Sequence, residues 1–132
     1  MILPYQPHSS QKKGLFCIGD GDQDIITEAV IDAISAWQVC PDIRAWATFS
    51  SSSLGKLRDL EFANPPILFF DWDTPGKNGK RAGQDATLKA QKLLQDARAV
   101  PWPESEEKQD INQLLRDGRP DEIGRLIAEA DW

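Results

Sequence analysis

The chain has 132 residues and a net charge of −6 at neutral pH, from 15 lysine and arginine residues against 21 aspartate and glutamate residues. Its residues are 40% hydrophobic and 27% charged, which is the balance of a globular domain. The acidic charge argues against a stand-alone nucleic-acid coat protein, because phosphate binding needs clustered lysine and arginine. It leaves room for an enzyme whose acidic site holds a metal ion.

Cys17 and Cys40 are the only cysteines of the chain, and His8 is its only histidine. Neither cysteine belongs to a Cys-x-x-Cys pair, so a zinc site is not expected, and both are interpreted as reduced thiols. No apolar run approaches the ~20 residues that span a membrane, and the N-terminus lacks the pattern of a signal peptide. We therefore expect a cytoplasmic protein with no membrane segment.

Residues 1–13 are polar and contain two prolines, and are expected to form a flexible lead-in to a single domain over residues 14–132. In that domain, short apolar runs bounded by turn residues predict strands, and apolar residues at helical spacing predict helices. The expected order is strand 14–19, strand 24–27, helix 29–39, strand 43–49, short helix 54–62, strand 67–70, helix 82–97, strand 99–100, helix 111–115 and helix 121–130. Strands that alternate with helices predict an α/β fold with a mostly parallel central sheet.

Two of these strands have informative patterns. Alternation places Ile43, Ala45, Ala47 and Phe49 on one face of their strand. Residues 67–70 form the most apolar run of the chain, and they predict a central strand that is buried on both faces.

Acidic residues follow two of the expected strands at their carboxyl ends. Glu28 follows the strand 24–27, and Asp71 and Asp73 follow the strand 67–70. Ligands of parallel α/β sheets bind at this edge, so three carboxylates converge there if the two strands are neighbours. Such carboxylates repel one another unless a cation lies between them, and oxygen ligands suit Mg²⁺. The alternative is that these acids cap strand ends and helix N-termini, where polar residues are common.

Three stretches, in this order, resemble motifs of the Toprim domains of DnaG-type primases and of phage and plasmid primases. Residues 25–35, IITEAVIDAIS, resemble an apolar strand that ends in glutamate and glycine before a helix. Residues 67–76, ILFFDWDTPG, resemble the Asp-x-Asp motif, and residues 108–115, KQDINQLL, resemble a Lys-Asp-x-Asn-Asp-Leu-Leu signature. The resemblance covers about residues 14–118 and implies a Toprim, Rossmann-like fold with helices on both faces of the sheet.

The resemblance also implies an activity. It implies Mg²⁺-dependent nucleotidyl transfer or phosphodiester cleavage on nucleic acid, with Mn²⁺ as an alternative ion. Asp71 and Asp73 would hold the metal, and Glu28 would act as general acid and base or join the metal shell. Asp32, one helical turn after Glu28, could support the site or could be an acid favoured in the first turn of its helix by the helix dipole. Ala29 stands where the family has glycine. The expected partners are nucleic acid or nucleotides, bound weakly by the isolated chain, and other replication domains.

Two side-chain assignments stay open. Lys77, Lys80 and Arg81 follow the Asp-x-Asp motif and could contact phosphates beside the metal, or could form a solvated loop that balances nearby acids. Trp72, between the two aspartates, could stack on a base or pack against a neighbouring loop.

Two other functional classes compete with a Toprim enzyme. Residues 71–74 partly match the Asp-x-Asp-x-Thr motif of HAD-type phosphatases, although that motif should lie near the start of the chain. A non-catalytic Toprim-like module that binds a partner or a nucleotide is favoured by Ala29, by the small size and by the net acidity. The sequence leaves open whether the chain is part of a larger replication protein.

Overall fold

In the computed structural model, which describes residues 9–12 and 14–131, six strands form one sheet in the order β1-β2-β4-β3-β5-β6. No helix in this part of the chain is long and apolar enough to cross a membrane. The strands are β1 (Ser9–Lys12), β2 (Leu15–Ile18), β3 (Gln23–Thr27), β4 (Ile43–Ala47), β5 (Ile67–Leu68) and β6 (Arg98–Ala99). The helices are α1 (Val30–Val39), the 3₁₀ helix η1 (Ser51–Asp59), α2 (Ala82–Leu93), α3 (Ile111–Arg116) and α4 (Pro120–Ala128).

The sheet has a parallel half and an antiparallel half. β4, β3, β5 and β6 run parallel to one another, and Ile25 of β3 lies opposite Ile67 of β5. β1 and β2 add an antiparallel extension beside β4. The predicted α/β fold with a mostly parallel sheet is confirmed.

The expectation of a flexible lead-in is wrong for residues 9–12, which form β1 and pair with β2. Residues 1–8 and 13 lie outside the described residues. The sequence of β1 is polar and has no apolar alternation that could predict a strand. β1 lies at the edge of the sheet, where backbone hydrogen bonds to β2 hold it without a buried face.

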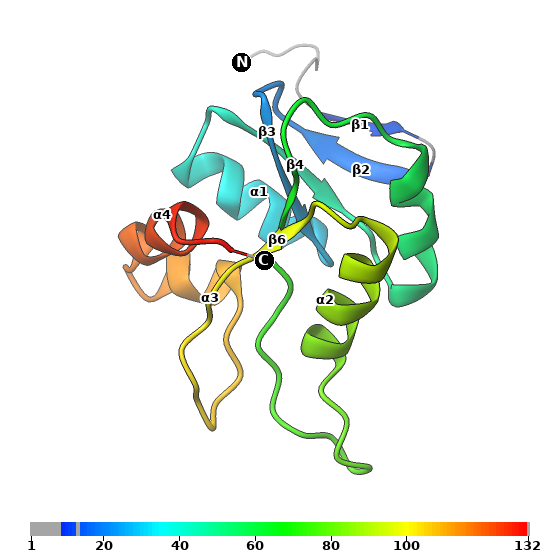
Figure 1. The fold of residues 1–132 in the computed structure, drawn as a ribbon. Coiled ribbons are helices and arrows are strands. Elements are labelled where there is room, and N and C mark those ends of the chain that lie inside the picture. Colours follow the sequence, from blue (N-terminus) through cyan, green and yellow to red (C-terminus); the bar gives the residue numbers. More distant parts are fainter. Residues whose placement is uncertain (1–8, 13, 132) are drawn as a thin grey trace.

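Helices cover both faces of the sheet (Figure 1). Successive strand residues point to opposite faces, so Ile25 packs among side chains of α1, α3 and α4, whereas Ile26 packs among those of η1 and α2. Phe69 and Phe70 continue this division just beyond β5, and they are 1% and 3% exposed. The prediction that residues 67–70 are buried on both faces is confirmed, although regular pairing in β5 stops at Leu68.

The strand predicted to run to Phe49 ends at Ala47. Ile43, Ala45 and Ala47 share one core, as their alternation predicts. Phe49 instead has a left-handed backbone with φ of 69° and is 46% exposed, because its N–H turns to donate to the Glu28 carbonyl at 2.8 Å. The alternation therefore predicted the face correctly and the length of the strand incorrectly.

Candidate functional site

Two loops meet at the carboxyl ends of the parallel strands. One connects β5 to α2 and the other connects β6 to α3, and both extend beyond the body of the domain (Figure 1). Trp72 of the first loop and Gln109 of the second exchange backbone hydrogen bonds of 2.9 and 2.8 Å. This bridge brings residues that are far apart in sequence to the end of β5.

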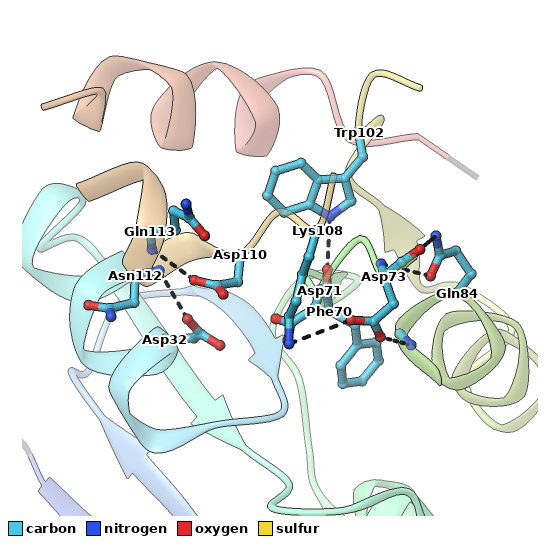
Figure 2. A network of polar contacts seen from close by, with 11 residues as sticks. Asp32, Phe70, Asp71, Asp73, Gln84, Trp102, Lys108, Asp110, Asn112 and Gln113 are labelled. Atoms are coloured by element: carbon cyan, nitrogen blue, oxygen red, sulfur yellow. Dashed lines mark hydrogen bonds and ion pairs between the residues drawn. The ribbon is translucent and has the colours of Figure 1, made fainter. Parts of the chain in front are cut away.

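An ion-pair cluster lies beside the bridge (Figure 2). Lys108 places its Nζ 3.6 Å from Asp71 Oδ2 and 3.7 Å from Asp73 Oδ1. The two carboxylate side chains are 13% and 18% exposed, whereas the lysine is 55% exposed. A cation therefore already lies between the two carboxylates of the Asp-x-Asp motif.

A second pair of acids lies on the other side of Lys108. Asp32, in the first turn of α1, is 3% exposed and accepts a hydrogen bond of 3.0 Å from the Asn112 N–H. Asp110 caps α3, because its Oδ1 accepts a hydrogen bond of 2.7 Å from the Gln113 N–H. Both carboxylates are thus anchored by the N-terminal backbone of α3 (Figure 2).

The start of α2 positions Asp73. The Gly83 N–H donates to Asp73 Oδ2 at 2.6 Å, and the Gln84 amide both accepts from the backbone N–H of Asp73 and donates to its carbonyl, each at 3.1 Å. A Cβ atom at Gly83 would lie 1.9 Å from the carbonyl oxygen of Asp71. Only glycine lets α2 approach the motif so closely.

The electrostatics of the cluster are dominated by burial. The pKa of Asp71 is raised to about 7, mainly by burial, with a further contribution from the negative charges of Asp32, Asp110 and Asp73 and with Lys108 opposing the rise. Burial also raises the pKa of Asp32, the hydrogen bond from the Asn112 N–H lowers it, and the negative charge of Asp110 raises it further. For Lys108 burial lowers the pKa, yet the facing carboxylates outweigh burial and the net shift is upward. The region therefore carries more negative charge than Lys108 can neutralise.

The donor set of this cluster fits a hard divalent cation. Carboxylate oxygens are the ligands that Mg²⁺ prefers, and Mg²⁺ is usually held by one or two carboxylates, water and substrate phosphate rather than by a cage of protein ligands. Within the described residues, no three His, Cys, Asp or Glu side chains are arranged to hold a metal ion by themselves. Asp71 and Asp73 thus fit an ion shared with a phosphate-bearing substrate, with the Lys108 ammonium marking where positive charge is favoured.

Of the four acids predicted from sequence, three lie in the cluster and one lies after the neighbouring strand. Asp71, Asp73 and Asp32 lie in the cluster just described. Glu28 is half-buried directly after β3, the neighbour of β5. The roles assigned to these four acids stay predictions.

The basic residues lie farther along the β5–α2 loop. Lys77 and Lys80 are exposed there, and Arg81 places its guanidinium 5.5 Å from the ring centre of Trp72. Trp72 packs against the neighbouring loop, because its indole N–H donates to the Ser105 carbonyl at 3.0 Å.

Lys108 and Asp110 were not among the predicted site residues. Both lie in the KQDINQLL stretch, which predicted the family but no site residue. The lysine and the aspartate within this family motif were the signal in the sequence that could have assigned Lys108 and Asp110 to the site.

Comparison with known proteins favours the resemblance to Toprim domains over the resemblance to HAD-type phosphatases. A sequence model of the family described as Toprim-like matches residues 25–115. Searching curated protein sequences finds no match.

Solved primase structures share the fold. One is a structure of the bacteriophage T7 lagging-strand DNA polymerase interacting with primase domains of two gp4 subunits bound to an RNA/DNA hybrid and dTTP. It matches with a TM-score of 0.66 and 19% identity over 93% of this chain and 64% of that chain. The Aquifex aeolicus primase matches with a TM-score of 0.55 and 19% identity over 83% of this chain and 26% of that one. This chain therefore spans less than two thirds of either.

Proposed function

The chain belongs to the Toprim-like family, and from this premise we propose that it is the Toprim domain of a primase-like DNA replication protein. The proposed chemistry is metal-dependent nucleotidyl transfer to a growing nucleic-acid strand, or phosphodiester cleavage if the domain works as a nuclease. The observation that carries the proposal is the pair Asp71 and Asp73 held around a positive charge at the carboxyl end of β5.

In this proposal Asp71 and Asp73 hold Mg²⁺ or Mn²⁺. The bound ion would neutralise phosphate charge and orient the reacting oxygens. Gly83 and Gln84 keep Asp73 in place through its carboxylate and its backbone. Asp32 and Asp110 strengthen the negative field from α1 and α3, and a stronger field favours cation binding.

The remaining side chains handle the proton and the phosphates. Glu28 accepts a proton from the attacking oxygen or supplies one to the leaving oxygen. Lys108 can turn from the carboxylates to a phosphate oxygen, since its side chain is more than half exposed. Lys77, Lys80 and Arg81 extend positive charge along the β5–α2 loop toward a nucleic-acid backbone.

The isolated chain is expected to bind nucleic acid weakly. Its net charge is −6, so few cations can displace phosphate counterions, and binding should vanish at moderate salt. A template would therefore be held together with other replication domains or proteins. Submicromolar binding to plain duplex DNA at physiological salt without metal would contradict this.

A non-catalytic Toprim-like module is the second candidate. Ala29 stands where the family has glycine, and its methyl group reduces the space next to Glu28 that a substrate would need. Lys108 can also balance the charge of Asp71 and Asp73 without a metal. Such a module would bind nucleotides or a partner and would show no turnover with Mg²⁺ or Mn²⁺.

The direct test is the effect of millimolar Mg²⁺ or Mn²⁺ on the melting temperature of three proteins. The wild type should be stabilised, by about 2.7 kcal/mol at a hundredfold excess over Kd. Asp71→Asn should lose this stabilisation. Asp85→Asn, an exposed acid in the first turn of α2, should keep it.

Two outcomes would decide against the metal site. If neither ion shifts the melting temperature or the amide spectra near Asp71, the binding module becomes the leading candidate. If the Asp71 and Asp85 variants respond alike, the effect is general screening by divalent ions.

A further inference from the structure

A pocket of about 330 Å³ opens next to the acidic cluster, between α2 and the segment that follows β6. Its wall includes Asp71, Trp72, Gln84, Leu88, Pro101 and Trp102. The volume lies at the lower end of the range for small-molecule sites. Asp71 belongs to both the pocket lining and the acidic cluster, so the two features meet at this side chain.

The aromatic walls of the pocket are held in fixed orientations. The indole N–H of Trp102 donates to the Phe70 carbonyl at 2.8 Å, and its ring meets the Phe69 ring edge-on at a centroid distance of 5.5 Å. The indole N–H of Trp72 donates to the Ser105 carbonyl. Both rings are therefore fixed before a ligand arrives, which limits the entropy lost on binding, and the Arg81 guanidinium lies over one face of the Trp72 ring.

The polar side chains of the pocket are already hydrogen-bonded within the protein. Gln84 uses both ends of its amide on the backbone of Asp73. The Thr87 hydroxyl donates to the Gly83 carbonyl at 2.9 Å. Gln84 and Thr87 are therefore engaged within the protein, and Asp71 is the polar side chain left to meet a ligand. The pocket would recognise that ligand mainly by shape and stacking rather than by hydrogen bonds.

Leu88 shows that the pocket is open to a ligand. It is 60% exposed, more than any other large apolar residue among those the structure describes, and it projects from α2 into the pocket lining. A ligand that covered it would gain the free energy of removing this surface from water.

We infer that this pocket holds the base of a nucleotide whose phosphates lie at Asp71 and Asp73, an inference that rests on the proposed function. A nucleotide carries its base and its phosphates on opposite sides of one ribose, and the pocket begins at the carboxylate that would share a metal with the phosphates. Aromatic and aliphatic walls accept any base, because every base has a stacking face. Purines bind more tightly than pyrimidines here, since they cover more surface.

The test compares Mg²⁺-ATP, Mg²⁺-CTP and Mg²⁺-tripolyphosphate, the last of which has no base, by isothermal titration calorimetry. Wild type should bind ATP at least about fivefold more tightly than tripolyphosphate, with CTP between them. Leu88→Ser should weaken ATP binding by about three- to tenfold and leave tripolyphosphate unchanged. Ile31→Ser is the matched control, because Ile31 is 52% exposed on α1 and lies outside the pocket lining.

The outcomes separate this inference from the proposed function. Equal affinities for ATP and tripolyphosphate, or equal losses in the two serine variants, would overturn the base pocket and leave the metal–phosphate site standing. ATP binding that survives in Asp71→Asn but is lost in Leu88→Ser would support the pocket and contradict the metal site. If no ligand binds, both are overturned.

Discussion

Lys108 Nζ lies 3.6 Å from Asp71 Oδ2, although the two residues are far apart in the sequence. The contact joins the segment before α3 to the end of β5, and the Trp72–Gln109 bridge next to it holds the two loops in register. The site therefore contains its own counter-charge, and removing that charge should change both stability and metal binding.

Replacing Lys108 by methionine should increase Mg²⁺ affinity several-fold, because an ammonium group within 4 Å of the carboxylates repels a second cation. The metal-free protein should lose no more than about 1 kcal/mol, since the lysine is more than half exposed. Calorimetric Mg²⁺ titration measures the affinity. Lys92→Met, an exposed lysine in the last turn of α2, serves as control. Unchanged or weaker Mg²⁺ binding in the Lys108 variant would argue that the ion does not bind where the Lys108 ammonium lies.

The stability of the metal-free protein should fall as pH rises from about 4 to about 7. The pKa of Asp71 is raised from its ordinary 3.8 to about 7 in the folded state, so in this window the native protein binds more protons than the unfolded chain. The contribution is fully present below the lower pKa and lost above the upper one, with a slope of at most about 1.4 kcal/mol per pH unit. Asp71→Asn should remove this fall, as measured by urea unfolding at about pH 4.5 and about pH 8. A parallel pH profile in the variant would contradict the shift.

Gly83→Ala should destabilise the fold by about 1–3 kcal/mol, because the new methyl group meets the Asp71 carbonyl. Gly124 is the matched control, since it also lies within a helix but has nothing within 4 Å of a built Cβ. Gly124→Ala should stabilise by up to about 1 kcal/mol through helix propensity. Denaturation midpoints of the two variants test this pair, and a similar change in both would disprove the close approach at Gly83.

Phe49→Gly should be more stable than Phe49→Ala by about 1 kcal/mol. Both variants lose the same half-exposed ring, so their difference isolates the cost of a side chain at φ of 69°. Thermal unfolding of the two proteins gives the comparison. If alanine is tolerated as well as glycine, the left-handed backbone at this position does not survive the substitution.

Local pattern predicted much of the fold because it depends on which residues must leave water. The run 67–70 could only be a central strand, and it is buried on both faces. The position of Asp71 and Asp73 at the carboxyl edge followed from that strand. The alternation from Ile43 to Ala47 likewise predicted which face of β4 packs in the core.

Local pattern failed where tertiary partners decide the structure. β1 is polar and exists because the backbone of β2 pairs with it. Phe49 leaves the strand because its N–H is taken by the Glu28 carbonyl. Neither the pairing of β1 with β2 nor the hydrogen bond of Phe49 can be predicted from hydrophobic periodicity.

The sequence by itself determined the family, the parallel core and two of the acids at its edge, because those features are written in apolar runs and short motifs. Only the tertiary structure decided that Lys108 pairs with those acids, that Asp110 and the buried Asp32 lie near them and that the pKa of Asp71 rises to about 7. Such properties arise from loops that meet across the sheet and from the water that their meeting excludes, and a linear pattern specifies neither.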